Sequence, residues 1–293
     1  MPANGVKAMK IVTWNVQWCR GVDRRVDPAR IVAETKALVD FDLLCLQEIA
    51  SNFADPRLAG SRGENQFSAI GQRLPEFTAV PGAIVDVPGE GGQRRHFGNL
   101  ILSRFPVGQV FRHLLPYPVD PGLRGMPRIA LEAVVHAPFG AVRVITTHLE
   151  YYGTVKRTAQ VDALREIYAE GSGHARLGKV VETGGGPFHD YPRPAATIIT
   201  GDFNFEPDDR MHARMVEPFA DGTPPLSDAW EAQHPGVAHP ATFKMYEKED
   251  PGEPEQHCDF IFVSADLVPR LKSIRVDQET QASDHQPVLA EFG

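Results

Sequence analysis

Cysteine is scarce in this chain, which carries only Cys19, Cys45 and Cys258 in 293 residues. Two of the three lie in apolar runs, where a small buried thiol is the usual interpretation. The sequence contains no C-x-x-C pair and no cysteine-histidine cluster with zinc spacing. These absences indicate no disulfide scaffold and argue against a structural zinc site.

Long hydrophobic runs and excess positive charge are also lacking. No apolar stretch approaches the roughly 18 residues that a membrane span needs, and the N-terminal MPANGVKAMK is polar before its first strand-like run. The 38 acidic and 30 basic side chains give a formal charge of -8, which disfavours a general nucleic-acid-coating protein but leaves a local basic cleft open. We expect a cytoplasmic protein without a membrane span, and the sequence points to no protein partner.

Apolar residues are plentiful enough for a folded core, at 42% of the chain. Short runs rich in Val, Ile and Thr predict strands at 10–16, 42–49, 99–103, 129–135, 142–149, 197–203 and 259–263. Apolar periodicity predicts helices at 28–39 and 155–170. Several strands follow one another with only turns between them, which favours antiparallel pairing over a purely parallel sheet.

The connections carry most of the glycine, proline and charge. We predict long surface loops at 87–95, 171–194 and 247–256. No internal repeat is visible, and no Ser-rich or Pro-rich linker divides the chain. We therefore expect one domain spanning residues 1–293.

Short polar motifs stand where the strand-like runs end. They are WN at 14–15, LQE at 46–48, THL at 147–149, GDFN at 201–204, CDF at 258–260 and SDH at 283–285. Each alone is weak, because a polar residue that closes a strand is usually just the first solvated one. Together they supply hard oxygen donors and no thiolate cluster, which suits Mg²⁺ or Mn²⁺ better than zinc.

With these motifs in this order, the sequence resembles the endonuclease/exonuclease/phosphatase superfamily from Asn15 to His285. GDFN, SDH and LQE are the most specific matches. The resemblance implies an α/β fold of the α+β type, in which two packed, mainly antiparallel β-sheets form a sandwich flanked by helices on both outer faces. It also implies a divalent-metal-dependent phosphoesterase in which an activated water attacks the phosphorus in line.

The resemblance makes Glu48 the principal carboxylate ligand of the metal, with Asn15 and Asp284 beside it. Mg²⁺ suits such a set, because it keeps several waters and takes only one or two carboxylates directly, which leaves room for a substrate phosphate oxygen. The expected cofactor is therefore Mg²⁺ or Mn²⁺.

Asp202 and Asn204 are two residues apart on an extended segment, so their side chains project to the same side. The carboxylate can accept a proton from a water that the amide orients. The alternative interpretation is an Asx turn that follows a strand.

The resemblance also places His148 and His285 against the scissile phosphate, and gives Asp259 the task of holding the tautomer of His285. Whether His285 acts as a base or as a stabilising cation stays open. Arg128, just before the 129–135 run, is the candidate cation for the substrate phosphate, and a surface arginine is the alternative.

The substrate class is less constrained by the sequence. Arg20, Arg24 and Arg25, and the run from Arg94 to His96, could contact a phosphate backbone. The acidic loop from Glu247 to Glu255 opposes a long polyanion, which favours a smaller phosphoester and predicts weak binding of duplex DNA. We therefore predict hydrolysis of phosphodiesters in a small substrate or in nucleic acid. A phosphomonoesterase acting on a small or inositol-type phosphate is the main alternative, and a non-catalytic binding scaffold is the third.

Overall fold

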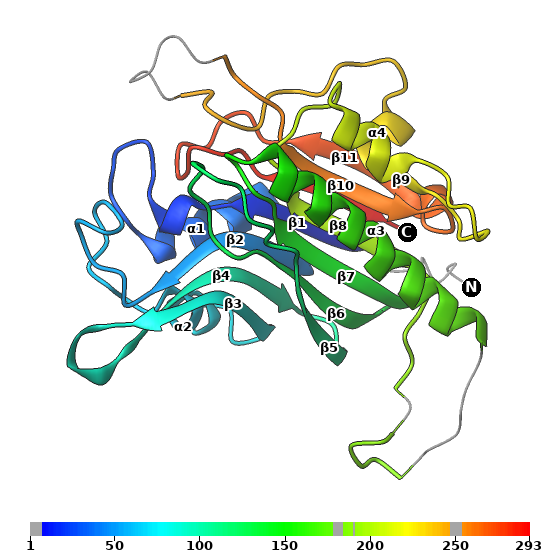
Figure 1. Ribbon diagram of the computed structural model, residues 1–293, viewed down its shortest axis with the longest axis horizontal. Helices are drawn as coiled ribbons and strands as arrows, with labels where there is room; N and C mark the ends of the chain where they lie inside the picture. The colour runs from blue at the N-terminus through cyan, green and yellow to red at the C-terminus, as the bar shows by residue number, and fades with distance from the viewer. Residues whose placement is uncertain (1–7, 178–183, 190, 247–253) are drawn as a thin grey trace, which may run out of the picture.

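The computed structural model describes residues 8–177, 184–189, 191–246 and 254–293. Two sheets of six strands pack face to face (Figure 1). The first sheet contains, in spatial order, β11 (Leu271–Val276), β12 (Val288–Phe292), β1 (Met9–Asn15), β2 (Leu43–Ser51), β4 (Arg94–Ser103) and β3 (Thr78–Pro88). The second contains β5 (Val107–Leu114), β6 (Ile129–Ala137), β7 (Gly140–His148), β8 (Thr197–Asp202), β10 (Asp259–Ser264) and β9 (Leu226–Asp228).

Each sheet has one parallel pair at its centre. β1 runs parallel to β2 with Asn15 opposite Gln47, and β7 runs parallel to β8 with His148 opposite Asp202. The other adjacent strands in both sheets pair antiparallel. The carboxyl ends of parallel strands meet at the same edge of a sheet, which is where open sheets gather their binding residues.

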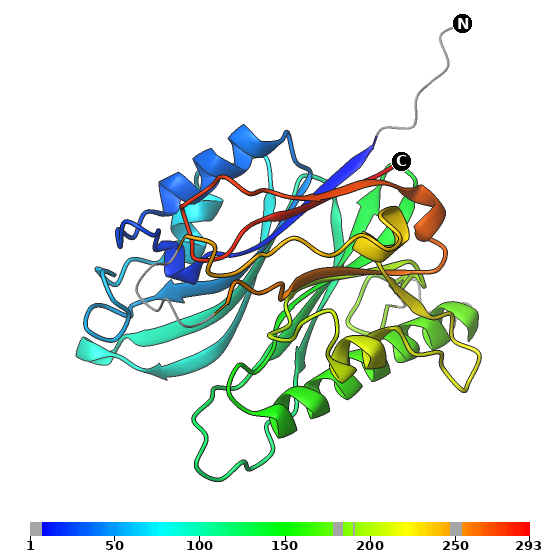
Figure 2. The ribbon, with the colours of Figure 1, turned by 90° about the horizontal axis from the view of Figure 1, so that it is seen from above.

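Helices cover both outer faces of the sandwich (Figure 2). α1 (Pro28–Leu38) and α2 (Gln66–Gly71) pack on the first sheet, and α3 (Thr154–Leu177) and α4 (Arg210–Val216) pack on the second. The short α5 (Ala229–Gln233) and the 3-10 turns η1 (Gln17–Cys19), η2 (Glu90–Gly92) and η3 (Val268–Arg270) lie in connections. The predicted sandwich with flanking helices is confirmed.

The central strands are buried on both faces. In β1, Ile11 points into the core between the sheets, whereas the next residue, Val12, packs under the helices of the first sheet. This double burial explains why such strands read as continuous apolar runs rather than as alternating patterns. The three cysteines are buried and unpaired, as the sequence indicated for two of them.

Five strands were not predicted from the sequence, namely β3, β5, β9, β11 and β12. β3 and β5 are outermost in their sheets, and β3 is largely exposed and contains Pro81 and Gly82, so neither shows a continuous apolar run. The predicted bounds of the 87–95 loop are wrong, because β3 and β4 extend into this range and leave only a short hairpin turn between them. The predicted 155–170 helix continues to Leu177, into the expected 171–194 loop, and residues 247–253 of the third loop lie outside the described residues.

No helix in the described ranges is long and apolar enough to cross a membrane.

Candidate active site

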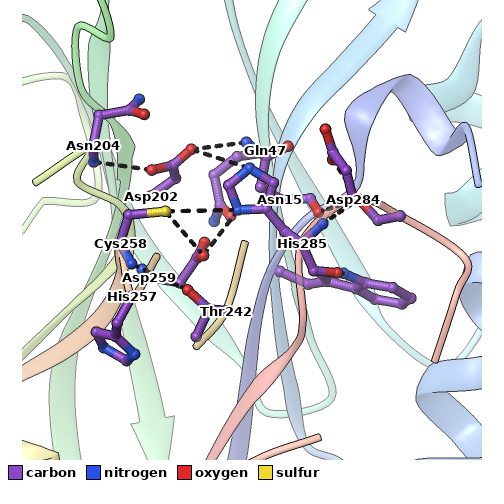
Figure 3. A network of polar contacts seen from close by, with 12 residues as sticks. Asn15, Gln47, Asp202, Asn204, Thr242, His257, Cys258, Asp259, Asp284 and His285 are labelled. Carbon is purple, nitrogen blue, oxygen red and sulfur yellow. Dashed lines mark hydrogen bonds and ion pairs between the residues drawn. The ribbon is translucent and has the colours of Figure 1, made fainter. Parts of the chain in front are cut away.

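All nine residues singled out by the sequence meet where β1, β2, β7 and β8 end. Figure 3 shows Asn15, Asp202, Asn204, Asp259, Asp284 and His285 among them. A pocket of about 400 Å³ opens at this edge, and we call it the central pocket. Its lining includes Glu48, Arg128, His148, Asp202, Asn204, Asp284 and His285. Asn15 and Asp259 contact these residues directly.

Irregular backbone aims two of these side chains. Glu48 lies where the β2–β4 register shifts, and its φ of 62° takes it out of the regular strand conformation. Asn204 follows β8 with a φ of 53°, so the prediction of an extended 202–204 segment is wrong, and Asp202 Oδ1 accepts from the Asn204 backbone N–H as in the Asx turn given as the alternative. Gly201 has a φ of 139°, and a Cβ there would lie 1.9 Å from the Thr147 carbonyl oxygen, so only glycine fits at this position. The glycine of the GDFN motif therefore allows the close approach of β7 and β8 beside the site.

Asp202 stands at the centre of the polar network. Its Oδ1 accepts a hydrogen bond from the Asn204 backbone N–H at 2.9 Å, and its Oδ2 accepts one from Asn15 Nδ2 at 2.9 Å. The same Oδ2 lies 3.5 Å from His148 Nε2 and 3.7 Å from His285 Nε2. Burial raises the pKa of Asp202 to about 6, with the nearby His285 opposing this rise and Asp259 adding to it. A carboxylate with such a pKa is a competent proton acceptor near neutral pH.

Glu48 and Asp284 bring further negative charge to the central pocket. Burial raises the pKa of Glu48 to about 7, and the neighbouring charge of Asp284 adds to the effect. Asn15 Nδ2 lies 3.3 Å from Glu48 Oε1, and Gln17 Nε2 donates to Asp284 Oδ2. Glu48, whose ionised form is disfavoured, lies near the carboxylate of Asp284, and carboxylate oxygens placed together in this way fit a hard divalent cation.

His285 is held by Asp259. Its Nδ1 donates to Asp259 Oδ2 at 2.9 Å, and the Phe243 ring packs against the imidazole with 4.5 Å between ring centroids. Burial alone would lower the pKa of His285, but the charges of Asp259 and Asp202 outweigh it and raise the pKa to about 10. The imidazole is therefore cationic near neutral pH, which favours the stabilising cation of the two roles left open.

Two buried side chains bring unpaired nitrogen atoms to the same pocket. Arg128 Nε and Nη1 and His148 Nδ1 have no hydrogen-bond partner among the described residues. Burial lowers the pKa of His148 well below its usual value, helped by the Arg128 and His285 charges, so this imidazole is neutral. Burial also lowers the pKa of Arg128, opposed by the charges of Glu150, Glu48 and Asp202. The alternative of a surface arginine is wrong, because Arg128 is only 5% exposed.

Several supporting contacts were missed by the sequence analysis. Trp14 Nε1 donates to the His285 carbonyl oxygen at 2.9 Å, and Ser283 Oγ donates to the Asn15 carbonyl oxygen at 2.8 Å. These bonds fasten the SDH segment to the end of β1. The WN and SDH motifs are each recognisable, but nothing in the sequence shows that they bind one another.

Aromatic rings around the rim of the pocket were missed as well. The additional lining residues are Trp18, Phe97, Tyr151, Tyr152 and Phe243. Tyr151 and Tyr152 are about half exposed, and they pack edge to face at 5.0 Å between ring centroids. The available signal was their position between the THL motif and α3, separated from the motif only by Glu150, because exposed aromatic side chains near a strand end favour ligand binding.

The contact between Asp259 and His285 leads to a test by histidine NMR. Asp259→Asn removes the largest factor that raises the His285 pKa, so we expect the pKa to fall well below its wild-type value. A histidine pKa raised on folding contributes stability that is full below about pH 6.5 and is lost as the pH rises through the folded-state pKa near 10. Because the His285 pKa of the variant is lower, the variant should lose this contribution at a lower pH than the wild type. An unchanged His285 titration would show that the two side chains do not interact.

The two-sheet fold and the acid-imidazole edge site together define a phosphoesterase architecture. The sequence matches the profile of the Endonuclease/Exonuclease/phosphatase family over residues 12–285. The chain belongs to this family, and the enzyme class predicted from its motifs, a hydrolase of phosphoester bonds, is confirmed.

Several solved structures share this fold. An endonuclease/exonuclease/phosphatase from Beutenbergia cavernae is 23% identical, with a TM-score of 0.66 over 98% of this chain and 71% of the other. A mannosyl-6-phosphatase from Bacteroides thetaiotaomicron is 20% identical, with a TM-score of 0.63 over 97% and 99%. A 3' phosphatase from Neisseria bound to a product DNA hairpin is 22% identical, with a TM-score of 0.60 over 97% and 99%. No curated protein sequence gives a significant match.

Proposed function

We propose that this chain is a Mg²⁺- or Mn²⁺-dependent phosphodiesterase that uses the central pocket as its active site. The observation that carries the proposal is the buried side chain of Arg128, whose Nε and Nη1 have no hydrogen-bond partner among the described residues and which lines the same pocket as Glu48, Asp202 and Asp284. Buried N–H groups without acceptors are costly, and a bound phosphate would supply the missing acceptors. The single-domain prediction belongs to the proposal, since the residues of this one site come from both sheets.

Asp202 acts as the general base in this mechanism. Its Oδ2 accepts a proton from the attacking water, and its raised pKa makes that transfer more favourable. The backbone N–H of Asn204 fixes Asp202 Oδ1, while Asn204 Nδ2 donates to the Leu149 carbonyl oxygen at 2.9 Å. This bond orients the Asn204 amide, so that its oxygen can help to place the water.

Three nitrogen-bearing side chains then stabilise the charge that develops on the phosphoryl oxygens. Arg128 and the His285 imidazolium contribute positive charge, and neutral His148 donates a hydrogen bond. Asp259 positions His285 by holding its Nδ1. Electrostatic stabilisation of this kind accounts for most of the catalysis in phosphoryl transfer.

Glu48 and Asp284 are the proposed carboxylate ligands of the metal. The bound ion would supply further positive charge to a nonbridging phosphate oxygen. Asn15 would join as a third ligand after its amide turns over, because Nδ2 now faces Glu48 and Asp202 while Oδ1 accepts from the Gln17 backbone N–H at 3.1 Å. In the orientation seen here, the amide instead bridges the metal carboxylate and the base.

The rim of aromatic side chains favours a phosphodiester over a bare phosphate. Tyr151 and Tyr152 line the same pocket as Arg128, and the Arg124 guanidinium packs over the Tyr152 ring at 4.8 Å from its centroid. Such surfaces bind the organic group of an ester by stacking and van der Waals contact. The monoesterase alternative keeps some support, because two structural neighbours are described as phosphatases.

The test compares two chromogenic esters that differ in one substituent. With Mg²⁺ or Mn²⁺ present, we expect bis(4-nitrophenyl) phosphate to be hydrolysed with a higher kcat/KM than 4-nitrophenyl phosphate, and excess EDTA to stop both reactions. The reverse preference would favour the monoesterase alternative. Full turnover in EDTA would contradict the metal requirement.

Duplex DNA is the third substrate in this comparison. A second cavity of about 890 Å³ lies beside the start of α1, lined by four arginines, Arg24, Arg25, Arg62 and Arg73. Most of the acidic loop that opposed a polyanion, Glu247 to Asp250 and Glu253, lies outside the described residues. We keep the expectation of weak duplex binding, and tight binding that weakens steeply with salt would make a nuclease the leading assignment.

A further inference from the structure

A second cluster of metal-ligand side chains lies outside the central pocket. It consists of His212 on α4, Asp228 at the end of β9 and His239 in the connection after α5, and we call it the His-Asp-His cluster. Each imidazole places its Nε2 atom 2.8 Å from the same carboxylate oxygen, Oδ2 of Asp228. The three side chains are at most 5% exposed.

The geometry converges on one point. Both imidazoles are aimed at the same carboxylate oxygen, and an imidazole nitrogen uses the same in-plane direction to bond a proton or a metal. The three donor atoms lie within 4.8 Å of one another. Ligand atoms around a tetrahedral zinc ion are about 3.3 Å apart, so each of the two 2.8 Å distances between Nε2 and Oδ2 would widen by about 0.5 Å to accept the ion.

Charge also favours a cation at this position. Asp228 is a buried carboxylate, and within the described ranges its ion pairs are with the two histidines and with no lysine or arginine. The other carboxylate oxygen, Oδ1, accepts from the Trp230 backbone N–H at 2.7 Å and so holds the group in place. Buried charges are stable when they are paired or bind a metal, and here the imidazoles are the only pairing that the fold supplies in this part of the chain.

We propose that His212, Asp228 and His239 bind a Zn²⁺ ion, with a water in the fourth position, at a site separate from that of the proposed catalytic metal. Two imidazoles and one carboxylate suit zinc, whereas Mg²⁺ prefers an all-oxygen set. The aromatic rings of Phe260 and Phe262, at 5.3 and 5.6 Å from the His212 ring, form an apolar surrounding. The expectation of no structural zinc rested on cysteine spacing, and this donor set contains no cysteine and forms only in the fold.

The site would fasten one wall of the central pocket. His239 lies four residues before Phe243, whose ring packs on His285, and three residues before Thr242. Thr242 Oγ1 accepts hydrogen bonds from the backbone N–H groups of Cys258 and Asp259 at 3.1 and 3.3 Å. An ion that ties His239 to α4 and β9 therefore restrains the segment that supports the catalytic imidazole.

The experiment titrates zinc into the full chain in the presence of excess Mg²⁺. Calorimetry measures the zinc affinity, and thermal unfolding measures the change in the melting midpoint. The Glu48→Gln background weakens binding at the central pocket. We expect one equivalent of zinc to bind the Glu48→Gln protein at micromolar concentration and to raise its melting midpoint by several degrees. Adding His212→Gln or His239→Gln should weaken the affinity at least tenfold, roughly the smallest effect seen when metal sites are disturbed.

His234→Gln is the matched control, because His234 lies near the cluster but places its Nε2 3.1 Å from the Ile274 carbonyl oxygen instead. Its zinc affinity should equal that of the background protein. Absence of zinc binding to the Glu48→Gln protein overturns the proposal, and this result needs neither histidine variant to fold. Equal affinity in all the variants overturns it too. None of these measurements uses hydrolysis, so they leave the proposed phosphodiesterase activity to its own test.

Discussion

Glu48→Gln is expected to lower kcat/KM by about 10²- to 10³-fold, the range typical of removing one group that stabilises transition-state charge. The substitution keeps the size of the side chain but removes the charge of the main proposed metal ligand. It also removes one of the carboxylates crowded near Asp284 and Asp202. Steady-state rates at several Mg²⁺ concentrations measure the effect, and the variant should need more metal to reach half of its maximal rate.

Stability distinguishes a ligand from a structural residue. A carboxyl group with its pKa raised to about 7 destabilises the folded protein progressively as the pH rises from the unfolded value toward 7, because the folded state disfavours its ionised form. Glutamine lacks this penalty. In EDTA at pH 8, the variant should therefore melt at or above the wild-type temperature, and Mg²⁺ should raise its midpoint less than that of the wild type.

Glu166→Gln serves as the control, since Glu166 is exposed on α3. It should leave the rate and the metal response unchanged. A Glu48→Gln protein that melts much lower than the wild type in EDTA would mean that Glu48 supports the fold. A variant with full activity would remove Glu48 from the proposed mechanism.

The centre of the fold was predictable from the sequence and its periphery was not. β1, β2, β7 and β8 are buried on both faces, so they leave continuous apolar runs that no helix period explains. β3 is an outermost strand whose side chains are mostly exposed, and its stability comes from pairing with β4 along its whole length. Pairing of this kind leaves no local pattern in the sequence.

The site shows the same division. Eight of its nine residues could be selected because each stands in a recognisable motif, and Arg128 was selected as the arginine just before the 129–135 run; the structure brings all nine together. The residues that hold the site in place could not be predicted from the sequence, because each is distant along the chain from the residue that it bonds. Trp14 bonds His285 across 271 positions, and Gln17 bonds Asp284 across 267. The His-Asp-His cluster likewise joins α4, β9 and a connecting segment, and no spacing rule predicts such a meeting.

Arg128→Ala is expected to lower kcat/KM for a phosphodiester by about 10²- to 10³-fold, because it removes a buried charge that would stabilise the phosphoryl oxygens. Arg128→Lys should recover part of this loss, since lysine keeps the charge but lacks the planar fork that bonds two oxygens together. Arg124→Ala, at the rim of the same pocket, is the control and should have a smaller effect on the rate.

Stability and chemical rescue make the Arg128 test specific. Because Nε and Nη1 of the buried guanidinium have no partner among the described residues, removing the side chain also removes a desolvation cost. We therefore expect Arg128→Ala to melt no lower than the wild type in the absence of substrate. Guanidinium ion added at non-denaturing concentration should restore part of the activity of this variant and none of that lost in Glu48→Gln. An Arg128→Ala protein that hydrolyses the diester at the wild-type rate would show that the phosphate binds elsewhere in the pocket.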